Sequence, residues 1–463
     1  MSIESFRAEI ADIPQTDDDS QVRRKSRDMT YSPILRDESK GLQAELVVQA
    51  RGTDDVVRVA RAAFRHKVTI MVRGAGTGDF GQGIPLAGGV VLDMTSMDEI
   101  LWVKDRVLRA EPGIRMLACD KLTRASDGLE LRMHPSTRAN ATLGGFVAGG
   151  HVGPGSCTWG ILRDPGNILG VQVVSVEEEP QIIELRGEHV NRVQHAYGTN
   201  GIITQVEMPL APAYSWMESI VDFGDFMGSA RFAYALNTAD GIPLKMIGIN
   251  SWPFPSYLTP LLKYTREGRH SVHVMVAAQY ADFFRWMVGE AGGFIAYEGL
   301  EGQGDFGSPL YEFNFGHTML YSRRAKAGGG GPLSLFPAND LLGSIERMHA
   351  RYGHIGPMHL DFKRIDGGIA CQGAPSIPYL GPEQLARTME EFQSEGLKAV
   401  NTHTFGVHQN GMKPINDVER AFKLRMDRDD LLNTGKFHTV DAGGGGAGDA
   451  LPASGFYATK VAH

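Results

Sequence analysis

Cysteine is scarce in this chain. Only three of the 463 residues are cysteine, Cys119, Cys157 and Cys371. An odd number of widely spaced cysteines gives no disulfide framework. The N-terminus shows no basic segment followed by an apolar run, and no apolar stretch approaches the roughly 18 residues of a transmembrane helix. We therefore expect a protein of the reducing cytoplasm without a transmembrane segment.

Positive charge is also in short supply. Lys and Arg total 46 against 54 Asp and Glu, so the net charge is -8 at pH 7. No basic patch runs along the sequence, and a nucleic-acid partner is not expected. A chain of this length is too long for one small core and indicates two domains or three.

Glycine, in contrast, is abundant, with 57 residues that gather in loops. Gly76, Gly78 and Gly81 formally match the G-x-G-x-x-G fingerprint of nicotinamide-type dinucleotide folds. That fingerprint needs a helix to begin at its glycines. Here four further helix breakers follow within eight residues, and Val90–Asp93 then has the composition of a strand. We predict a long strand-to-strand loop from Val68 onward that binds a pyrophosphate through backbone N–H groups, the alternative being an ordinary glycine-rich turn.

Several blocks of this sequence resemble the vanillyl-alcohol oxidase and p-cresol methylhydroxylase flavoproteins. Residues 73–93 look like the pyrophosphate loop of that family, residues 134–170 like its flavin-facing segment, and residues 197–206 like the Gly-x-Ile-Thr strand that closes its FAD domain. Residues 427–437 are similar to its C-terminal Asn-Pro-Gly-Lys turn, with Thr434 in place of the proline. The resemblance implies an α+β, two-domain FAD-binding PCMH-type fold with an α+β cap domain for the substrate.

The resemblance also implies a set of FAD-binding residues: Arg73, Gly74, Ala75, Gly76, Thr77, Gly78, Gly83, Pro135, Ser136, Thr142, Gly144, Gly145, Gly149, Gly150, Trp159, Gly201, Ile203 and Lys436. Some family members attach the flavin to a histidine near the position of Thr77. This chain has no histidine between His66 and His134, which excludes that route. Cys157 follows Gly149-Gly-His151, whereas a flavin-linked cysteine in the family precedes that segment. We expect non-covalent FAD and a small buried Cys157.

The positions of prolines and glycines suggest that the chain divides into five segments. These are a helical extension at 1–40, the FAD-binding domain at 41–213, the cap at 214–411, a returning segment at 412–440 and a glycine-rich mobile tail at 441–463. Thr53–Phe64 has the capping and apolar spacing of an amphipathic helix between two strands.

Histidines are the first candidates for catalysis, because hydride removal beside a hydroxyl is easier when the hydroxyl proton also leaves. The segments 354–359 and 401–408 resemble motifs of D-lactate and D-2-hydroxyglutarate dehydrogenases that supply metal ligands and a catalytic histidine. The first histidine spacing is two residues shorter here, and Thr402 stands where those proteins have glutamate, so no metal is expected. His403 keeps its place and is the leading candidate. His359 and His408 suit a structural, hydrogen-bonded histidine equally well.

Other candidates are weaker. A carboxylate substrate would need a cation, for which Arg323, Arg324 and above all Arg364 are available. Tyr311 and His317 are secondary catalytic candidates, although the alternating aromatics of residues 311–318 are also typical of one buried face of a strand.

The sequence thus predicts an FAD-dependent oxidoreductase that transfers a hydride from a small hydroxyl-bearing substrate to flavin N5. A 2-hydroxy acid is favoured over a phenolic or other alcohol. A nicotinamide-dependent reductase and a flavin electron-transfer subunit without its own substrate stay open as alternatives. Electrons would pass to O₂, a quinone or a redox protein, and a homodimer is one open arrangement.

Overall fold

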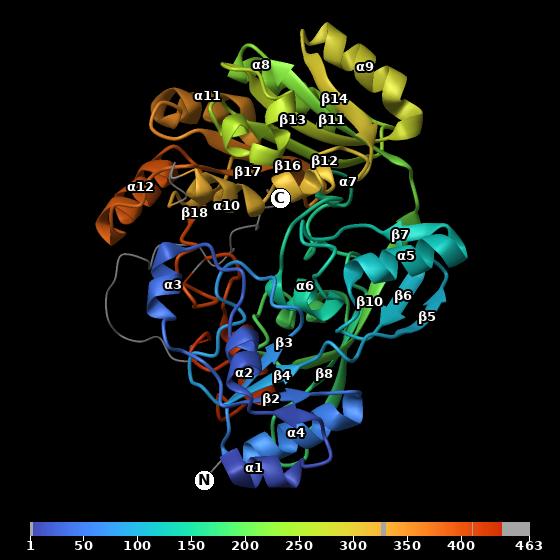
Figure 1. Ribbon diagram of the computed structural model, residues 1–463, viewed down its shortest axis with the longest axis vertical. Helices are drawn as coiled ribbons and strands as arrows, with labels where there is room; N and C mark the ends of the chain where they lie inside the picture. Colours follow the sequence, from blue (N-terminus) through green and yellow to red (C-terminus); the bar gives the residue numbers. More distant parts are fainter. Residues whose placement is uncertain (1–2, 326–329, 410, 438–463) are drawn as a thin grey trace. The chain divides into compact units, whose positions relative to one another are not determined.

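The computed structural model describes residues 3–325, 330–409 and 411–437 (Figure 1). The chain divides into two compact units. Within the described residues, unit 1 comprises 3–151, Leu162–Ala213, 403–409 and 411–437, and unit 2 comprises Val152–Ile161, 214–325 and 330–402. The predicted tail at 441–463 lies outside the described residues.

Unit 1 begins with a four-stranded sheet of order β1-β2-β4-β3. Its strands are β1 (Gln15–Thr16), β2 (Leu46–Gln49), β3 (Ile70–Arg73) and β4 (Val90–Asp93). β4 pairs in parallel with both β2 and β3, which requires crossover connections. The first crossover is helix α4 (Thr53–His66), as predicted, and its Val56, Val59 and Ala63 are fully buried. Helices α1 (Ile3–Glu9), α2 (Asp19–Lys25) and α3 (Pro33–Glu38) complete this part.

A second sheet of unit 1 has the order β5-β6-β10-β8-β9, and β7 also pairs with β10. Its members are β5 (Ile100–Lys104), β6 (Val107–Ala110), β7 (Leu129–Leu131), β8 (Gly170–Val174), β9 (Ile182–Arg186) and β10 (Ile202–Pro212). Helices α5 (Met116–Asp127) and α6 (Leu143–Gly149) share its apolar core. From the returning segment, helix α13 (Asp417–Met426) adds the buried Met426 to that core.

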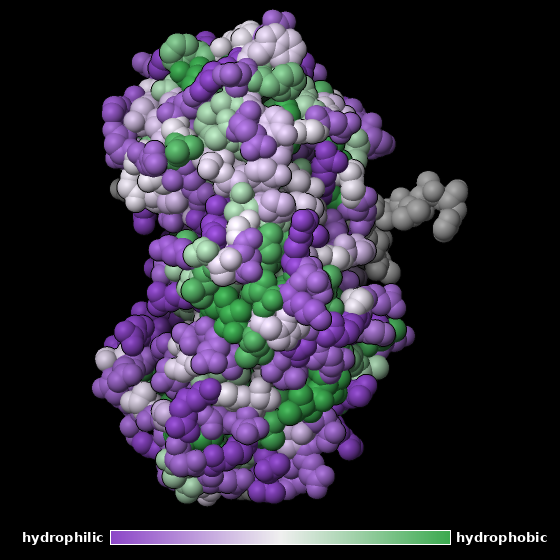
Figure 2. Space-filling view, turned by 90° about the vertical axis from the view of Figure 1, so that its right-hand side faces the viewer, coloured by the Kyte–Doolittle hydropathy of each residue, from purple (hydrophilic) through white to green (hydrophobic). Residues whose placement is uncertain are grey.

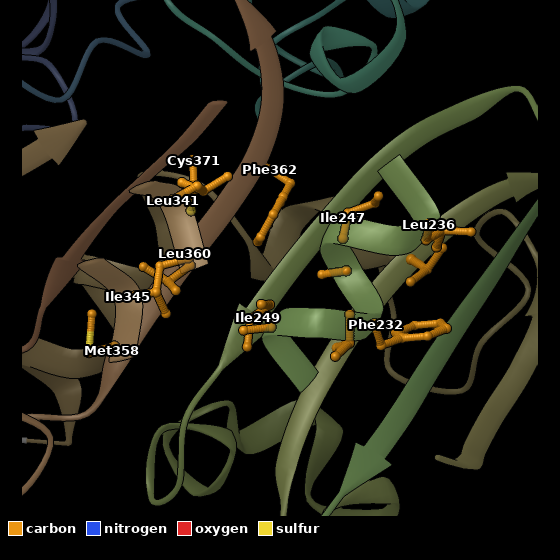
Figure 3. Packing of buried hydrophobic residues seen from close by; sticks show 14 of the residues in the cluster. Phe232, Leu236, Ile247, Ile249, Leu341, Ile345, Met358, Leu360, Phe362 and Cys371 are labelled. Atoms are coloured by element: carbon orange, nitrogen blue, oxygen red, sulfur yellow. The ribbon is translucent and has the colours of Figure 1, made fainter. Parts of the chain in front are cut away.

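Unit 2 is built on an eight-stranded antiparallel sheet of order β14-β11-β13-β12-β16-β17-β15-β18. The strands are β11 (Trp216–Phe223), β12 (Leu244–Asn250), β13 (His270–Ala277), β14 (Phe294–Leu300), β15 (Leu333–Leu335), β16 (Met358–Ile365), β17 (Gly368–Pro375) and β18 (Lys398–Val400). One face packs on the helices α8 (Phe226–Thr238), α9 (Ala281–Glu290), α11 (Leu341–Tyr352) and α12 (Pro382–Ser394). Figure 3 shows Phe232 and Leu236 of α8 against Ile247 and Ile249 of β12, and Leu341 and Ile345 of α11 beside Leu360 of β16.

Residues 311–318 do not form the strand that their alternating aromatics suggested. Leu310–Phe313 is a short 3-10 helix, η5, and helix α10 (His317–Arg324) follows it. Tyr311 and Phe313 are nevertheless buried, because both side chains of this short helix pack in the aromatic cluster of unit 2. The alternating aromatics therefore predicted burial correctly, but the predicted strand was wrong.

The division into units differs from the predicted segments in two places. Val152–Ile161, which includes helix α7 (Ser156–Trp159), groups with unit 2, because Gly155 N–H donates to Lys245 O (2.6 Å) and Thr158 Oγ1 to Leu244 O (2.6 Å). Residues 403–409 and 411–437 group with unit 1, where Val407 N–H donates to Lys436 O (2.8 Å).

Hydrophobic and hydrophilic side chains are interspersed on the face drawn in Figure 2, where the hydrophobic ones gather in several patches. Large apolar side chains at the surface include Leu122, Trp286 and Leu380. Within the described residues, no helix has the length and apolar character needed to cross a bilayer.

Candidate functional site

The loop between β3 and β4 is the centre of the candidate site in unit 1. It runs from Gly74 to Gly89 without a helix, and both flanking strands lie side by side in one sheet. Gly76 and Gly81 have φ of 70° and 75°, the left-handed region that favours glycine. The predicted strand-to-strand loop is confirmed.

The first half of this loop presents free backbone donors. Within the described part of the chain, the N–H groups of Gly74, Ala75, Gly76, Thr77 and Gly78 donate to no protein acceptor, although the segment is half-buried. The carbonyls of the same loop are engaged, since Met29 N–H donates to Gly78 O (2.8 Å) and Arg73 Nη2 to Ala75 O (3.4 Å). A row of unpaired N–H groups in a concave glycine loop is an anion site.

Packing behind the loop leaves no room for side chains. A Cβ on Gly74 would lie 2.0 Å from Thr142 Oγ1, and one on Gly76 would lie 1.9 Å from Arg73 Nη2. On Gly81 it would lie 2.5 Å from the ring of Phe405. The glycines are therefore needed so that the loop can lie directly on these three side chains. This cradle fits a diphosphate, which needs close approach of backbone and a dense set of donors.

The predicted flavin-facing segment lies in the same unit and joins the loop through Thr142. Thr142 caps helix α6 and accepts from Gly145 N–H (3.4 Å). Gly144 N–H donates to Pro112 O (2.8 Å), and a Cβ at Gly144 would lie 2.5 Å from Pro112. Helix α6 ends at Gly150, where a Cβ would strike the His195 ring at 2.2 Å.

Most of the other predicted FAD residues also belong to unit 1. Pro135 O accepts from Arg138 N–H (3.1 Å), Ser136 is buried, Gly149 lies against His151, and Gly201 (φ 110°) and Ile203 lie at the start of β10. Trp159 does not, since it ends helix α7 in unit 2.

Lys436 lies behind the second half of the loop. Its Nζ donates to Gly81 O (2.8 Å) and Gln82 O (2.7 Å), and the side chain is fully buried. Asn433, with φ of 45°, donates from the same turn to Gln82 O (3.2 Å) and Tyr197 O (2.6 Å). The C-terminal turn therefore holds the loop from behind by its carbonyls.

His403 is held beside this loop in unit 1. Its Nδ1 lies 2.8 Å from Ser32 Oγ, and its ring meets that of Tyr31 edge-on at 6.4 Å. Tyr31 in turn contacts Phe80 of the loop edge-on at 5.9 Å, and Phe405 lies over Gly81. The leading catalytic candidate thus shares its surroundings with the diphosphate cradle.

His195 is a residue of this site that the sequence analysis missed. Burial, reinforced by the charges of His151, Lys413 and Arg163, lowers the pKa of His195 to about 3, so the ring is neutral at physiological pH. Its Nε2 has no hydrogen-bond partner in the described residues, and its φ is 55°. The signal available in the sequence was its position two residues before Tyr197-Gly-Thr-Asn-Gly201.

Unit 2 carries a buried polar row on the sheet face opposite helices α8 and α11. In β16, Met358, Leu360 and Phe362 enter the apolar core, so the alternate residues His359, Asp361 and Lys363 point to the other face. Strand register places Gly248 between Asp361 and His273, and Asn250 beside His359. All the side chains of this row are buried. A polar sheet face is ordinarily solvated, so a buried one marks a candidate site.

His359 is the centre of that row. Its Nδ1 lies 2.8 Å from Asn250 Oδ1, and its Nε2 lies 3.1 Å from Asp361 Oδ1. His359 Nε2 and Asp361 Oδ1 are both buried and make no hydrogen bond within the described residues, so the His359–Asp361 contact is a close approach without hydrogen-bond geometry. Lys363 donates to Gln372, and burial lowers the pKa of Lys363 to about 8 against the opposing charge of Asp361.

The remaining catalytic candidates have different surroundings. Arg364 donates to the carbonyls of Cys157 (3.2 Å) and Asn237 (3.2 Å), so its guanidinium ties together parts of unit 2. Tyr311 belongs to the aromatic core of that unit. His317 Nδ1 donates to Glu312 O (2.9 Å), and its buried Nε2 has no hydrogen-bond partner in the described residues. His317 can therefore accept a proton, whereas Arg364 is engaged.

All three cysteines are free and buried. Burial raises the pKa of the Cys157 thiol to about 12 and raises those of Cys119 and Cys371 as well. A thiol that stays protonated is a poor nucleophile. Over the described residues, no group of three or more His, Cys, Asp or Glu side chains is placed to hold a metal.

The cradle belongs to a known class of domain. Residues 44–181 match the family described as FAD binding domain. Residues 44–181 thus form an FAD-binding domain, which makes FAD the cofactor.

Individual relatives agree with this class. The chain is 28% identical to glycolate oxidase subunit GlcD of Bacillus subtilis over 210 residues, 43% of each chain. It is 28% identical to D-lactate dehydrogenase of Anaerostipes hadrus over 191 residues, 38% of each. It is 37% identical to D-2-hydroxyglutarate dehydrogenase of Pseudomonas putida over 119 residues, 24% of this chain and 11% of that protein. The chain therefore spans less than half the length of these curated relatives.

The fold is similar over a longer range. A solved structure of alkyldihydroxyacetonephosphate synthase superposes with a TM-score of 0.67 at 17% identity, covering 94% of this chain and 85% of that one. At this identity the likeness establishes the fold. It confirms the predicted α+β, PCMH-type architecture.

Proposed function

We propose that this protein is an FAD-dependent oxidoreductase that oxidises a small hydroxyl-bearing substrate, with a 2-hydroxy acid as the favoured class. The β3–β4 loop carries the proposal, because its free amides and its glycines form a diphosphate cradle in a domain of the FAD-binding family. Relatives named for glycolate, D-lactate and D-2-hydroxyglutarate support the substrate class. Bound FAD supplies a hydride acceptor at flavin N5.

The chain holds FAD without a covalent bond in this proposal. The N–H groups of Gly74 to Gly78 would hold the diphosphate, and Thr142, Gly144 and Gly145 would shape the flavin-facing segment. The buried Cys157 thiol, with its raised pKa, is unsuited to attack on the flavin. Denaturation should therefore release all the flavin into the supernatant, and flavin that stays with the precipitated chain would contradict this part.

Histidine side chains take up the substrate's hydroxyl proton. His403 is our first choice, because Ser32 orients its ring beside the FAD cradle. His317 is the second choice, because its hydrogen bond to Glu312 O leaves the lone pair of Nε2 available when the ring is neutral. His359 is held between Asn250 and Asp361, so we assign it to orientation of the substrate rather than to proton abstraction.

Anaerobic mixing with candidate substrates tests the function. Oxidised flavin absorbs near ~450 nm and bleaches when a hydride reaches it. We expect bleaching by at least one of glycolate, D-lactate, L-lactate and D-2-hydroxyglutarate, and little by aliphatic or phenolic alcohols. Bleaching by a phenolic alcohol alone would favour the second substrate class. Immediate bleaching by NADPH would favour a reductase, and no bleaching by any of them would favour an electron-transfer subunit.

The electron acceptor is a separate question. One relative is named as a subunit of glycolate oxidase, and both direct use of O₂ and transfer to a quinone or redox protein are compatible with that name. Oxygen consumption with a working substrate distinguishes the two. An oxidase would consume one O₂ per substrate, whereas a dehydrogenase would need an added acceptor dye.

A further inference from the structure

Two buried cations lie behind the diphosphate cradle. Arg73 is 7% exposed and Lys436 is 0% exposed. Arg73 donates to the carbonyls of Arg27 and Ala75, and Lys436 donates to those of Gly81 and Gln82. Both side chains therefore bind the loop through backbone oxygen, and neither uses a carboxylate of its own.

The positive charge of this pair lacks a full counter-charge. No carboxylate of the described residues lies within ion-pair distance of either side chain. Asp28 is the carboxylate whose charge acts on both of them, but its oxygens accept from Gly83 N–H (3.0 Å) and from Thr30. A buried cation without a close counter-ion is costly. Accordingly, burial lowers the pKa of Lys436 to about 7 and that of Arg73 from its usual value.

The hydrogen bonds to carbonyls also orient the free donors. In a trans peptide the C=O and N–H groups point to opposite sides. Arg73 donates to Ala75 O from behind the loop, so the N–H of Gly76 in the same peptide points to the other side. Lys436 donates to Gly81 O, and the N–H of Gln82 in that peptide therefore also points away from the cation. Neither N–H donates to an acceptor among the described residues. The two cations thus turn the donors outward and add positive charge beneath them.

We propose that Arg73 and Lys436 are positioning residues whose missing counter-charge is the diphosphate of FAD, so that FAD binding is coupled to uptake of a proton at Lys436. They act through the loop and do not touch the cofactor. This inference rests on FAD being the cofactor and is independent of the substrate. It predicts a cofactor affinity that depends on pH.

The direction of that dependence follows from the surrounding charges. Asp28 of the N-terminal segment is the charged group that faces Lys436 among the described residues, and the turn at Asn433 adds only neutral donors. The diphosphate favours the charged amine, so the pKa of Lys436 rises when FAD binds. Affinity is then fully present below about pH 7, the pKa in the free protein, and is lost as the pH rises through the higher pKa of the complex.

The test is titration of the full-length apoprotein with FAD between pH 6 and pH 9, followed by flavin fluorescence. We expect the Kd of the wild type to rise about tenfold per pH unit above neutrality, the slope of one proton. Lys436→Met should weaken binding at pH 6 by roughly 10- to 100-fold, the range for a charge-assisted hydrogen bond, and should abolish the slope. Lys436→Arg should restore affinity without the slope, since arginine stays charged.

Lys413→Met is the matched control. Lys413 is also fully buried in the returning segment, and it donates to the carbonyls of Asn191 and Gln194. Lys413 differs from Lys436 in that its Nζ lies 3.5 Å from Glu419 Oε2 and donates to no carbonyl of the β3–β4 loop. We expect Lys413→Met to lower the melting temperature of the apoprotein while the pH slope of FAD affinity persists. A flat wild-type profile, or equal effects of Lys436→Met and Lys413→Met on FAD affinity, would overturn the proposal.

Discussion

His403 Nδ1 lies 2.8 Å from the hydroxyl oxygen of Ser32, a residue 371 positions earlier in the chain. Ser32 is the N-cap of helix α3, where its Oγ accepts from Leu35 N–H (3.2 Å). One hydroxyl therefore both caps a helix and orients the leading catalytic candidate. This relationship fixes the imidazole on the N-terminal segment that also contacts the cradle through Tyr31.

Replacement of His403 tests its assignment as the base. His403→Ala should slow flavin reduction by about 100-fold or more, the usual contribution of a general base, while FAD stays bound. His408→Ala is the control, because His408 is exposed in the same segment and should leave the rate unchanged. Stopped-flow absorbance under anaerobic conditions measures both. Equal rates for His403→Ala and the wild type would move the role to His317.

The packing of Gly76 on Arg73 makes a prediction about cofactor retention. Gly76→Ala should be purified largely free of flavin, because the new methyl group would lie 1.9 Å from Arg73 Nη2 and displace the cradle. Gly41→Ala is the control: Gly41 has φ of 82° and nothing within 4 Å of an added Cβ, so it carries similar backbone strain, about 1 kcal/mol, without a clash. The ratio of flavin absorbance to protein absorbance measures the flavin content of each purified variant. Full flavin content in Gly76→Ala would show that the cradle is not where FAD binds.

The pair formed by His359 and Asp361 should show energetic coupling. His359→Ala leaves the Asp361 carboxylate buried without its nearest partner, which should cost about 3 kcal/mol of unfolding free energy. The double variant with Asp361→Asn should be less destabilised than the sum of the single variants, by ~0.5–3 kcal/mol. Asp366→Asn, in an exposed turn, serves as control. Urea unfolding of the wild type, the two single variants, the double variant and the control gives the coupling, and strict additivity would argue against an interaction between the two side chains.

The raised thiol pKa values predict chemical inertness. Cys119, Cys157 and Cys371 should resist alkylation by iodoacetamide in the native protein at pH 8, because buried protonated thiols react slowly. All three should react after unfolding in guanidinium. Mass spectrometry counts the adducts. Rapid modification of the native protein at Cys157 would show that helix α7 is less protected than its burial indicates.

The sequence anticipated the parts of the fold that depend on local rules. Helix α4 and the strand-to-strand loop follow from spacing and from helix breakers, and both are confirmed. The 3-10 helix at Leu310–Phe313 was mistaken for a strand. Its buried aromatic residues Tyr311 and Phe313 are two positions apart, which is also the spacing of side chains on one face of a strand.

The partners of the candidate residues could not be anticipated. Ser32 meets His403, and Asn250 meets His359, across 371 and 109 residues of chain. Such pairs depend on strand order and on how the returning segment packs, which no local pattern encodes. Arg364 illustrates the same limit. The sequence suggested that it binds a carboxylate substrate, whereas in the fold its guanidinium donates to the carbonyls of Cys157 and Asn237. Asp361 was recoverable in principle, because alternation along Met358–Ile365 places it on the face of His359.

Anaerobic single turnover with a 2-hydroxy acid tests the central claim most directly. The purified FAD-bound protein is mixed with glycolate, D-lactate, L-lactate or D-2-hydroxyglutarate, and flavin absorbance and the 2-oxo acid product are measured together. We predict that one of these acids bleaches the flavin completely and yields one 2-oxo acid per FAD. Flavin that stays oxidised with every acid, in a preparation that dithionite reduces fully, would contradict the assignment to 2-hydroxy acid oxidation.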